Sequence, residues 1–468
     1  MKFIEFSYGI SNDENPLKAG AYATSNALKY LDTSLENINI VFLYSSPDYD
    51  PEEVLNGVKL ILGNKIPIIG GSSKFGIVDG NLIEDGVVVG ILASKYFHVG
   101  LGVALGASIN PRECGRKAVH DAIKNLGMLP RMVMVFMDYC KFEEEIINGI
   151  VDVLGFTIPI FGGVTSDNFE FKKTYQYCND VYIDSVVCVA FGGDIVPKIS
   201  VGKITDENLD SNKKITITET NKRYVYELNG VNAIEYYKNI TNFRGSNQNL
   251  ENDKKFYLSN AFGVTDSNGE IYLKGPIFIK NGVLVFGSNV MGGNELSLFS
   301  INEESIENFF EKSVKLINNA PPNYPPSVTF CCISSYLTEI SKESVEKCLK
   351  SCPLNPIFGF TTYGEVVLKN YYNYTVSMCS LVPDLASISA KEGIHMITKY
   401  PATKETILKI NELGGSTKIE ELAKALGIHR RTAYDRIEPL LQYGFVEKDH
   451  ALVKITDFGK LLLKIIKK

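Results

Sequence analysis

The sequence has few of the residues, and none of the patterns, that build common cofactor or metal sites. Its five histidines are dispersed without metal-ligand spacing, and its nine cysteines form no CxxC pair. There is no GxGxxG or GK[ST] phosphate loop, and no HExxH or GxSxG hydrolase motif. We therefore expect no cofactor, no metal and buried, reduced cysteines. Cys114, flanked by Arg112 and Arg116, is the one candidate for redox chemistry.

Long hydrophobic runs are also missing. Apolar stretches such as Gly86–Ala93 have the length of a strand, well short of the ~20 residues of a membrane span. The first residues, Met1–Tyr8, lack the apolar core of a signal peptide. With 468 residues, 45% of them hydrophobic and 22% charged, we expect a cytoplasmic protein of two or three domains.

Three segments resemble one another: Ile66–Ser73, Ile158–Thr165 and Asn355–Thr362. An apolar strand begins 26 to 28 residues before the proline of each segment. Helical patterns lie between strand and proline, over Pro51–Leu62, Glu143–Leu154 and Lys342–Leu349. Further strand-like runs follow the glycines. This spacing predicts a repeated unit of helix, strand, helix, Gly-rich turn and strands, and therefore an α+β fold.

The repeats also predict the domain organisation. Two units run through residues 1–195, and the third lies in residues 196–385 after a strand-rich insert. Residues 386–402 read as a linker, since Pro401 discourages helix just before it. Residues 403–468 form a small C-terminal domain.

Motifs in the repeated part resemble those of FIST proteins, which are sensory proteins with an N-terminal and a C-terminal FIST domain. They are, in the order of the family, Gly70–Gly76, Pro159–Asn168, Leu228–Tyr237, Asn260–Val264, and Phe358–Val366 with Asn373–Thr375. The resemblance spans about residues 20–382. It implies a small-ligand sensor without catalysis, for which amino acids are the suggested ligands. An arginine expected shortly after the cysteines of Phe330–Ser335 is missing, which points to a different ligand if that arginine binds a carboxylate in relatives.

The Gly-rich turns are the candidates for ligand binding, because consecutive backbone amides can form an anion nest. Asp167 or Glu365 would then hold the ammonium group of an amino acid. The alternative is that the glycines form structural turns and that the polar residues cap them. The candidate ligand-binding residues are Gly70, Gly71, Ser72, Ser73, Gly162, Gly163, Thr165, Asp167, Asn168, Tyr363, Gly364, Glu365 and Asn373.

The C-terminal domain resembles the winged helix-turn-helix of prokaryotic transcription regulators. The apolar spacing of Ile419–Leu426, followed by Gly427, predicts a short helix that ends sharply. A second, Arg-rich helix and a hairpin within Phe445–Ile455 follow. Residues 402–468 hold 13 Lys or Arg and 9 Asp or Glu, a net charge of +4. The candidate DNA-binding residues are His429, Arg430, Arg431, Thr432, Tyr434, Arg436, Lys448 and Lys454.

The sequence thus predicts a one-component transcriptional regulator that senses a small molecule and binds double-stranded DNA. We expect a homodimer, with apolar residues of the last helix, Leu461–Leu463, Ile465 and Ile466, as contact candidates. Two alternatives stay open. The chain is a scaffold that recruits protein partners, or a hydrolase or transferase with Ser73, Thr165 or Cys332 as its nucleophile.

Overall fold

The computed structural model describes residues 3–204, 214–265, 270–322, 326–354 and 356–467. They form two compact units. The larger unit contains residues 4–193 and 197–382, and the smaller unit contains residues 194–196 and 383–467 together with Phe3. Both α-helices and β-sheets are present throughout, so the α+β class is confirmed.

The larger unit is built from three six-stranded sheets with the same strand arrangement. The first sheet has the order β1 (Glu5–Ser11), β6 (Val87–Ala93), β2 (Ile38–Ser45), β3 (Ile68–Ser72), β10 (Gln176–Cys178), β11 (Val181–Tyr182). The second has the order β7 (Phe97–Leu105), β12 (Ser185–Gly193), β8 (Met132–Met137), β9 (Ile160–Val164), β24 (Glu365–Val367), β25 (Asn370–Tyr372). The third has the order β13 (Ile195–Gly202), β26 (Val376–Pro383), β22 (Val328–Ser334), β23 (Ile357–Thr362), β4 (Phe75–Val78), β5 (Asn81–Glu84).

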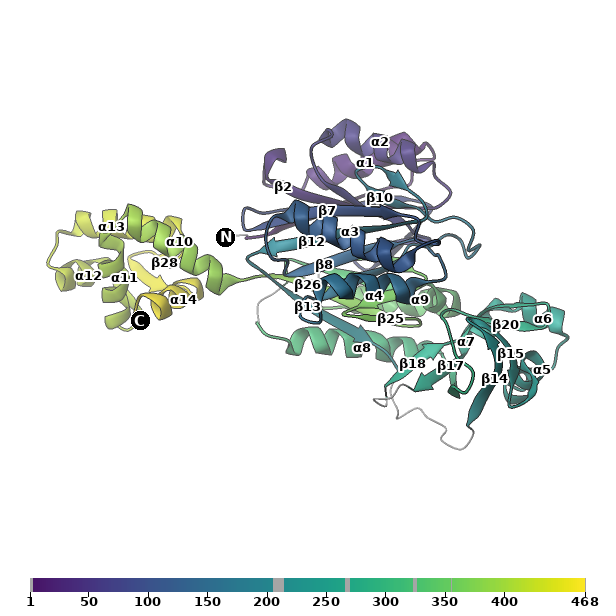
Figure 1. Ribbon diagram of the computed structural model, residues 1–468. Helices are drawn as coiled ribbons and strands as arrows, with labels where there is room; N and C mark the ends of the chain where they lie inside the picture. The colour runs from purple at the N-terminus through teal and green to yellow at the C-terminus, as the bar shows by residue number, and fades with distance from the viewer. Residues whose placement is uncertain (1–2, 205–213, 266–269, 323–325, 355, 468) are drawn as a thin grey trace. The chain divides into compact units, whose positions relative to one another are not determined.

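Each sheet carries a pair of helices (Figure 1). The pairs are α1 (Pro16–Leu28) with α2 (Pro51–Leu62), α3 (Pro111–Leu126) with α4 (Glu143–Leu154), and α8 (Glu303–Asn319) with α9 (Ser335–Ser351). The asparagine caps differ among the repeats. The side chains of Asn15 and Asn302 accept hydrogen bonds from backbone amides, whereas Asn110 makes no such bond. The repeated unit is therefore confirmed, with one more strand at its start than the sequence suggested.

The three units exchange their hairpins in a cycle. The hairpin that follows β3 is β4–β5, and it joins β23 of the third sheet. The hairpin that follows β23 is β24–β25, and it joins β9 of the second sheet. The hairpin that follows β9 is β10–β11, and it joins β3 of the first sheet. Each sheet is thus completed by a neighbouring unit.

The predicted strand-rich insert lies between β13 and α8 and forms the teal lobe of the larger unit in Figure 1. Its strands join one extended antiparallel sheet in the part of the chain that the structure describes. The strands are β14 (Ile215–Asn221), β15 (Tyr224–Leu228), β16 (Val231–Asn232), β17 (Asn260–Thr265), β18 (Ile271–Lys274), β19 (Pro276–Lys280), β20 (Val283–Phe286) and β21 (Glu295–Ser300). The helices are α5 (Ala233–Ile240), α6 (Asn247–Asn252) and α7 (Lys254–Ser259).

The C-terminal part, here called the C-terminal module, is residues 402–467 of the smaller unit. It comprises α11 (Ala402–Glu412), β27 (Ser416–Lys418), α12 (Ile419–Leu426), α13 (Arg430–Gln442), β28 (Val446–Asp449), β29 (Leu452–Ile455) and α14 (Asp457–Ile466). The predicted helix 419–426 is confirmed to the residue, and Gly427 ends it with φ +64°. Thr456 caps α14 by accepting from the Gly459 amide at 3.0 Å.

Residues 386–402, expected to be a linker, are largely helical. Helix α10 (Leu385–Lys399) begins at the N-cap Asp384 and packs against α14 of the C-terminal module. Its residues Ile388 and Met396 are fully buried, which explains why the segment is ordered. Among the described residues, no helix is long and apolar enough to cross a membrane.

The nine cysteines are buried and unpaired, as expected. Cys114 is 4% exposed, and burial raises the pKa of its thiol to about 11. A buried thiol with a raised pKa is a poor nucleophile, because the thiolate is the reactive form. The interpretation of Cys114 as a redox candidate is therefore wrong.

Candidate functional site

The three Gly-rich segments meet in the middle of the larger unit, where β3, β9 and β23 end. We call the residues 72–74, 165–167 and 361–363 the turn junction. The Ser166 amide donates to the Ser72 carbonyl at 3.1 Å. The hydroxyls of Ser166 and Ser73 both donate to the Thr361 carbonyl, at 2.9 and 3.0 Å. Segments that are almost 300 residues apart in the sequence are therefore in direct contact.

The glycines before the junction serve packing between strands. They lie within β3, β9 and β23 rather than in loops. A Cβ atom placed on Gly70, Gly162 or Gly359 would come within 1.9, 2.0 and 1.7 Å of a carbonyl oxygen on the neighbouring parallel strand. Only glycine fits this close approach, so the first glycine of each repeat has a structural reason.

The polar side chains of the junction are occupied by the protein. Thr165 Oγ1 donates to the Met137 carbonyl at 3.1 Å and accepts from Gln176 Nε2 at 2.7 Å. Ser72 Oγ accepts from the Tyr175 amide at 3.2 Å. The candidates Gly70, Gly71, Ser72, Ser73, Gly162, Gly163, Thr165, Tyr363, Gly364 and Glu365 are all buried. At these positions the contacts favour the alternative of structural turns.

Asp167 organises the loop that leaves the junction, here called the aromatic loop (residues 167–173). Its carboxylate accepts from the backbone amides of residues 170 and 171 at 3.0 Å, 172 at 2.9 Å and 173 at 3.3 Å. The Tyr363 hydroxyl donates to the same carboxylate. Asp167 therefore fixes the position of Phe169 and Phe171, and its oxygens already have donors.

Of the remaining candidates, Glu365 belongs to the β24–β25 hairpin, where it is paired with Tyr372, Asn373 directly follows this hairpin, and Asn168 lies in the aromatic loop. Glu365 is fully buried, and its Oε2 accepts from Thr375 Oγ1 at 2.7 Å, whereas Oε1 has no partner among the described residues. Burial raises the pKa of this carboxyl well above its usual range, which favours the neutral acid. Asn373 donates to the Tyr363 carbonyl at 3.0 Å, and the exposed Asn168 donates to Asp48 at 3.0 Å.

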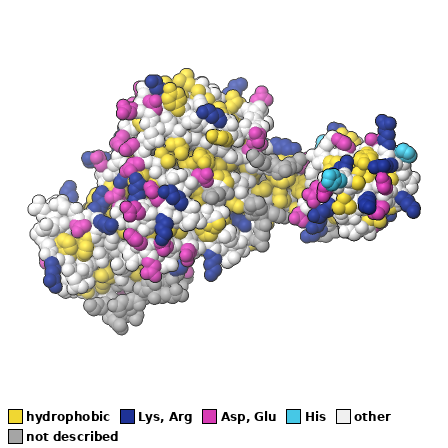
Figure 2. All heavy atoms as spheres, turned by 180° about the vertical axis from the view of Figure 1, so that it is seen from behind, with side chains coloured by type: hydrophobic (Ala, Val, Ile, Leu, Met, Phe, Trp, Pro, Cys, Tyr) yellow, Lys and Arg dark blue, Asp and Glu magenta, His cyan; other side chains and the backbone are white. Residues whose placement is uncertain are grey.

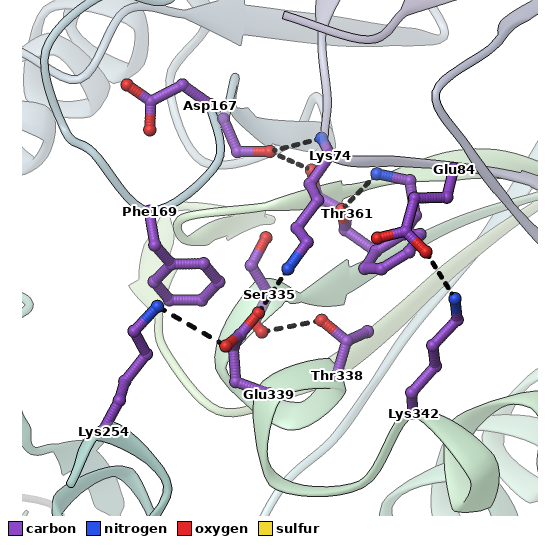
Figure 3. A network of polar contacts seen from close by, with 12 residues as sticks. Lys74, Glu84, Asp167, Phe169, Lys254, Ser335, Thr338, Glu339, Lys342 and Thr361 are labelled. Carbon is purple, nitrogen blue, oxygen red and sulfur yellow. Dashed lines mark hydrogen bonds and ion pairs between the residues drawn. The ribbon is translucent and has the colours of Figure 1, made fainter.

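A cationic cluster lies beside the junction (Figure 3). Lys74 forms an ion pair with Glu339 of α9 at 2.6 Å, and Lys254 of α7 approaches the same carboxylate at 3.5 Å. Lys254 Nζ also lies 4.5 Å from the ring centroid of Phe169. Figure 3 shows the Asp167 carboxylate turned away from Lys74. The aromatic loop thus connects the turn junction with helices of the insert and of the third repeat.

A cavity of about 430 Å³ has Glu170 and Phe171 of the aromatic loop in its wall. Its wall includes Tyr139, Phe171, Arg223, Phe278 and Lys280, so the repeats and the insert both contribute to it. No sequence motif predicted this cavity. Arg223 lies in the turn between β14 and β15, and the adjacent sequence gives no indication that its side chain is buried.

The candidate nucleophiles lack a catalytic arrangement. Ser73 Oγ is engaged with the carbonyls of Phe75 and Thr361, at 2.7 and 3.0 Å. Thr165 Oγ1 is hydrogen-bonded to the Met137 carbonyl and to Gln176. Burial raises the pKa of the Cys332 thiol well above its usual range. No described residue is placed as a base for any of the three. Nucleophilic catalysis requires such an activating group.

In the C-terminal module, the exposed side of α13 carries the candidate DNA-binding residues. His429 is the N-cap of α13 and accepts from the Arg431 amide at 3.3 Å. Arg431 and Thr432 are exposed, and the Arg431 side chain has no ion pair or hydrogen bond with any described residue. Arg430 pairs with Glu420 at 3.1 Å. The start of α13 is therefore accessible to a partner.

The other candidates differ in accessibility. Lys448 of β28 lies over the ring of Tyr434 at 4.8 Å, which connects the hairpin to α13. Lys454 pairs with Glu447 at 3.4 Å, and Arg436 is turned toward Glu405 of α11 at 2.8 Å. On the face shown in Figure 2, Lys and Arg side chains of the module are interspersed with Asp and Glu.

The expected dimer contacts on α14 are divided between the core of the C-terminal module and its surface. Leu462 and Leu463 are 0% and 5% exposed and belong to the core of the C-terminal module. Ile465 is 38% exposed. Two of the five apolar candidates therefore pack inside the module, where their burial stabilises α14 on its neighbours, and they are not available for a dimer contact.

Residues 39–231 match the family model of the FIST N domain. The match begins within β2, so it covers the first repeat without β1 and α1, the second repeat and the beginning of the insert. It confirms the resemblance over this part of the chain. A comparison with curated proteins found no match.

Similar solved structures have low identity. The crystal structure of a cyanuric acid hydrolase from A. caulinodans has a TM-score of 0.38 and 7% identity, over 81% of this chain and 99% of that chain. A second cyanuric acid hydrolase structure has a TM-score of 0.33 and 8% identity, over 81% of this chain and 100% of that chain. A CRP/FNR-family transcriptional regulator from Thermus thermophilus has a TM-score of 0.13 and 10% identity, over 45% of this chain and 84% of that chain. These likenesses are too weak to assign an activity.

Proposed function

We propose that the chain is a small-ligand sensor that regulates transcription. The larger unit binds the ligand, and the C-terminal module binds double-stranded DNA as a winged helix. The observation that carries the DNA-binding half is the accessible start of α13, with Arg431 and Thr432 exposed and the β28–β29 hairpin beside it. An arginine at this place on a recognition helix can read a guanine edge in the major groove.

The sensor half is supported by the FIST N domain match over residues 39–231. The contacts at the junction do not favour an amino-acid ammonium group as the ligand feature held there. Asp167 is saturated by loop amides and Tyr363, and burial raises the pKa of Glu365 well above its usual range, which favours the neutral acid. Ligand binding is better supported at the cavity beside the aromatic loop.

The chain acts without catalysis in this proposal. Ser73, Thr165 and Cys332 are engaged or buried, and no described residue is placed to activate them. In the alternative function, a scaffold that recruits proteins, the larger unit is the same but the C-terminal module binds a protein. The two differ in whether the module binds DNA.

A route for communication is supported by Asp194, which follows β12 directly and belongs to the smaller unit. Its carboxylate accepts from Lys391 Nζ and Ser387 Oγ of α10, each at 2.7 Å. Helix α10 in turn packs on α14. A change in β12 therefore has a charged, hydrogen-bonded connection to the helix that carries the module.

The test is fluorescence anisotropy with DNA from upstream of the gene, at two salt concentrations. Arg431→Ala should weaken specific binding by ~1–3 kcal/mol if the side chain is bidentate to guanine. Arg244→Ala removes an exposed arginine from the larger unit and is the matched control, with unchanged binding expected. Added salt should weaken DNA binding by all three proteins, because phosphate contacts release counterions.

Two results would contradict the proposal. Absence of binding to this DNA and to randomised DNA would make the module a protein-binding domain. An equal loss of DNA affinity in Arg431→Ala and Arg244→Ala would show that α13 is not part of the recognition surface. We further propose a homodimer on a two-fold site, and a monomer in sedimentation both free and on DNA would exclude it.

A further inference from the structure

The cavity beside the aromatic loop has the size of a small-molecule site, about 430 Å³. Three separate parts of the larger unit build it. The segment after β8 contributes Tyr139, the aromatic loop contributes Phe171, and the insert contributes Arg223, Phe278 and Val283. A ligand in the cavity would therefore contact the repeats and the insert at once.

The walls are suited to a flat ring. The ring centroid of Phe171 lies 4.2 Å from that of Tyr363 in a stacked arrangement, 4.5 Å from Phe278 in an edge arrangement and 5.0 Å from Tyr139. Asp167 holds the backbone of Phe171 through its amide. Aromatic side chains fixed in this way offer ring faces and edges for another planar group.

The charge in the cavity favours an anion. Lys141 and Lys280 are exposed lining residues without an ion pair to any described residue, whereas the acidic lining residue Glu170 is paired with Lys172 at 3.0 Å. The lining therefore has two lysines without an ion pair, and its one glutamate is already paired with a lysine. An anionic group gains from this field, and a cationic ligand would be repelled.

Arg223 supplies a buried donor. It is 1% exposed, and its guanidinium donates to the Tyr139 hydroxyl at 2.7 Å and to Glu143 at 3.0 Å. Its Nε has no hydrogen-bond partner among the described residues. A buried donor without a partner is costly, because its hydration is lost without replacement. Less than 1 Å² of Nε is accessible, so an acceptor oxygen of a ligand would reach this donor only after a small shift of the Arg223 side chain toward the cavity that it lines.

We infer that this cavity binds a small planar anion of the aromatic-carboxylate class, with the ring against Phe171 and Phe278 and the carboxylate toward Arg223 and Lys280. This inference rests on the sensor half of the proposed function and is independent of DNA binding. It differs from amino-acid binding at the Gly-rich turns, since no ammonium partner is needed.

The test uses ¹⁹F NMR of the full-length protein with 4-fluorobenzoate as the probe and 4-fluorobenzamide as its neutral counterpart. We expect the benzoate to bind and the benzamide to bind at least about tenfold more weakly, a difference of ~1.4 kcal/mol. Lys280→Glu reverses a charge at the cavity rim and should weaken benzoate binding by about tenfold. Lys65→Glu makes the same charge change at an exposed residue between α2 and β3, and should leave binding unchanged.

Val283→Phe adds a ring to the cavity wall and should abolish binding, with native melting behaviour as the control for folding. If this variant does not fold, the benzoate affinities of Lys280→Glu and Lys65→Glu still test the inference. No binding of benzoate up to about 10 mM, equal binding of benzamide, or unchanged binding in a folded Val283→Phe variant would overturn the inference. DNA binding measured on the same samples without probe reports only on the proposed function, so the two failures are distinguishable.

Discussion

Replacing Glu365 with glutamine tests whether this carboxyl is a buried neutral acid or an ionised ligand-binding group. The side chain is fully buried, with Thr375 Oγ1 as a donor to Oε2 and no cation among its hydrogen-bond partners in the described residues. Burial raises the pKa of the folded-state carboxyl well above its usual range. Glutamine keeps the shape and the acceptor but cannot ionise.

The sign of the pH effect follows from the raised pKa. Below the unfolded-state pKa, about 4.3, both states are protonated and Glu365 imposes no ionisation penalty. Above it, the unfolded state releases a proton that the folded state retains. The free energy of unfolding of the wild type therefore falls by about 1.4 kcal/mol for each pH unit up to the folded-state pKa. Glu365→Gln escapes this loss, so its stability relative to the wild type should rise with pH.

The assay is urea denaturation of both proteins from about pH 5 to about pH 7, the window that lies above the unfolded-state pKa. Glu311→Gln is the matched control, because Glu311 is exposed on α8 and should show no pH-dependent difference from the wild type. The amide introduced by Glu365→Gln carries two N–H donors where the neutral acid has one O–H donor. The extra unsatisfied donor costs ~1–3 kcal/mol at every pH and does not alter the trend. A difference between Glu365→Gln and wild type that is flat with pH would refute the neutral-acid interpretation.

Two further substitutions test the structural interpretation of the site. Asp167→Asn replaces a two-oxygen acceptor with one oxygen and should destabilise the protein by ~2–4 kcal/mol, with faster amide hydrogen exchange in residues 168–173; unchanged exchange there would contradict its role in the loop. Gly359→Ala places a Cβ 1.7 Å from the Cys331 carbonyl oxygen and should cost ~3 kcal/mol or more, whereas Gly282→Ala, with φ +84° and no atom within 4 Å, should cost ~1 kcal/mol. Equal costs in thermal denaturation would contradict the packing role of Gly359.

The local structure followed closely from the sequence. Helices α2, α4 and α12 begin and end at the predicted residues, because capping or glycine residues flank apolar positions at helical spacing. Helix α10 was missed because Pro383 and Pro401 bracket it and its two core residues are eight positions apart. Propensity alone does not show that such a helix has a partner to pack on.

The candidate site was harder to predict for a physical reason. A carboxylate such as Asp167 is suited equally to a ligand ammonium group and to the amides of its own loop, and only the course of the backbone decides between them. Arg223 shows the converse. Its burial depends on Glu143 and Tyr139, which are 80 and 84 residues away in the sequence and come from a different part of the chain.

The hairpin exchange has a consequence for the predicted boundary at residue 195. A fragment that ends there would contain β4–β5 without β23, and β9 without β24, so two sheets would have an uncovered strand edge. Only the first sheet would be complete, since β10 joins β3 within the fragment. The three repeats therefore depend on one another for their backbone hydrogen bonds. A ligand that contacts both the aromatic loop and the insert would act on the three repeats together, because Asp167 and Tyr363 connect that loop to the turn junction that all three repeats share.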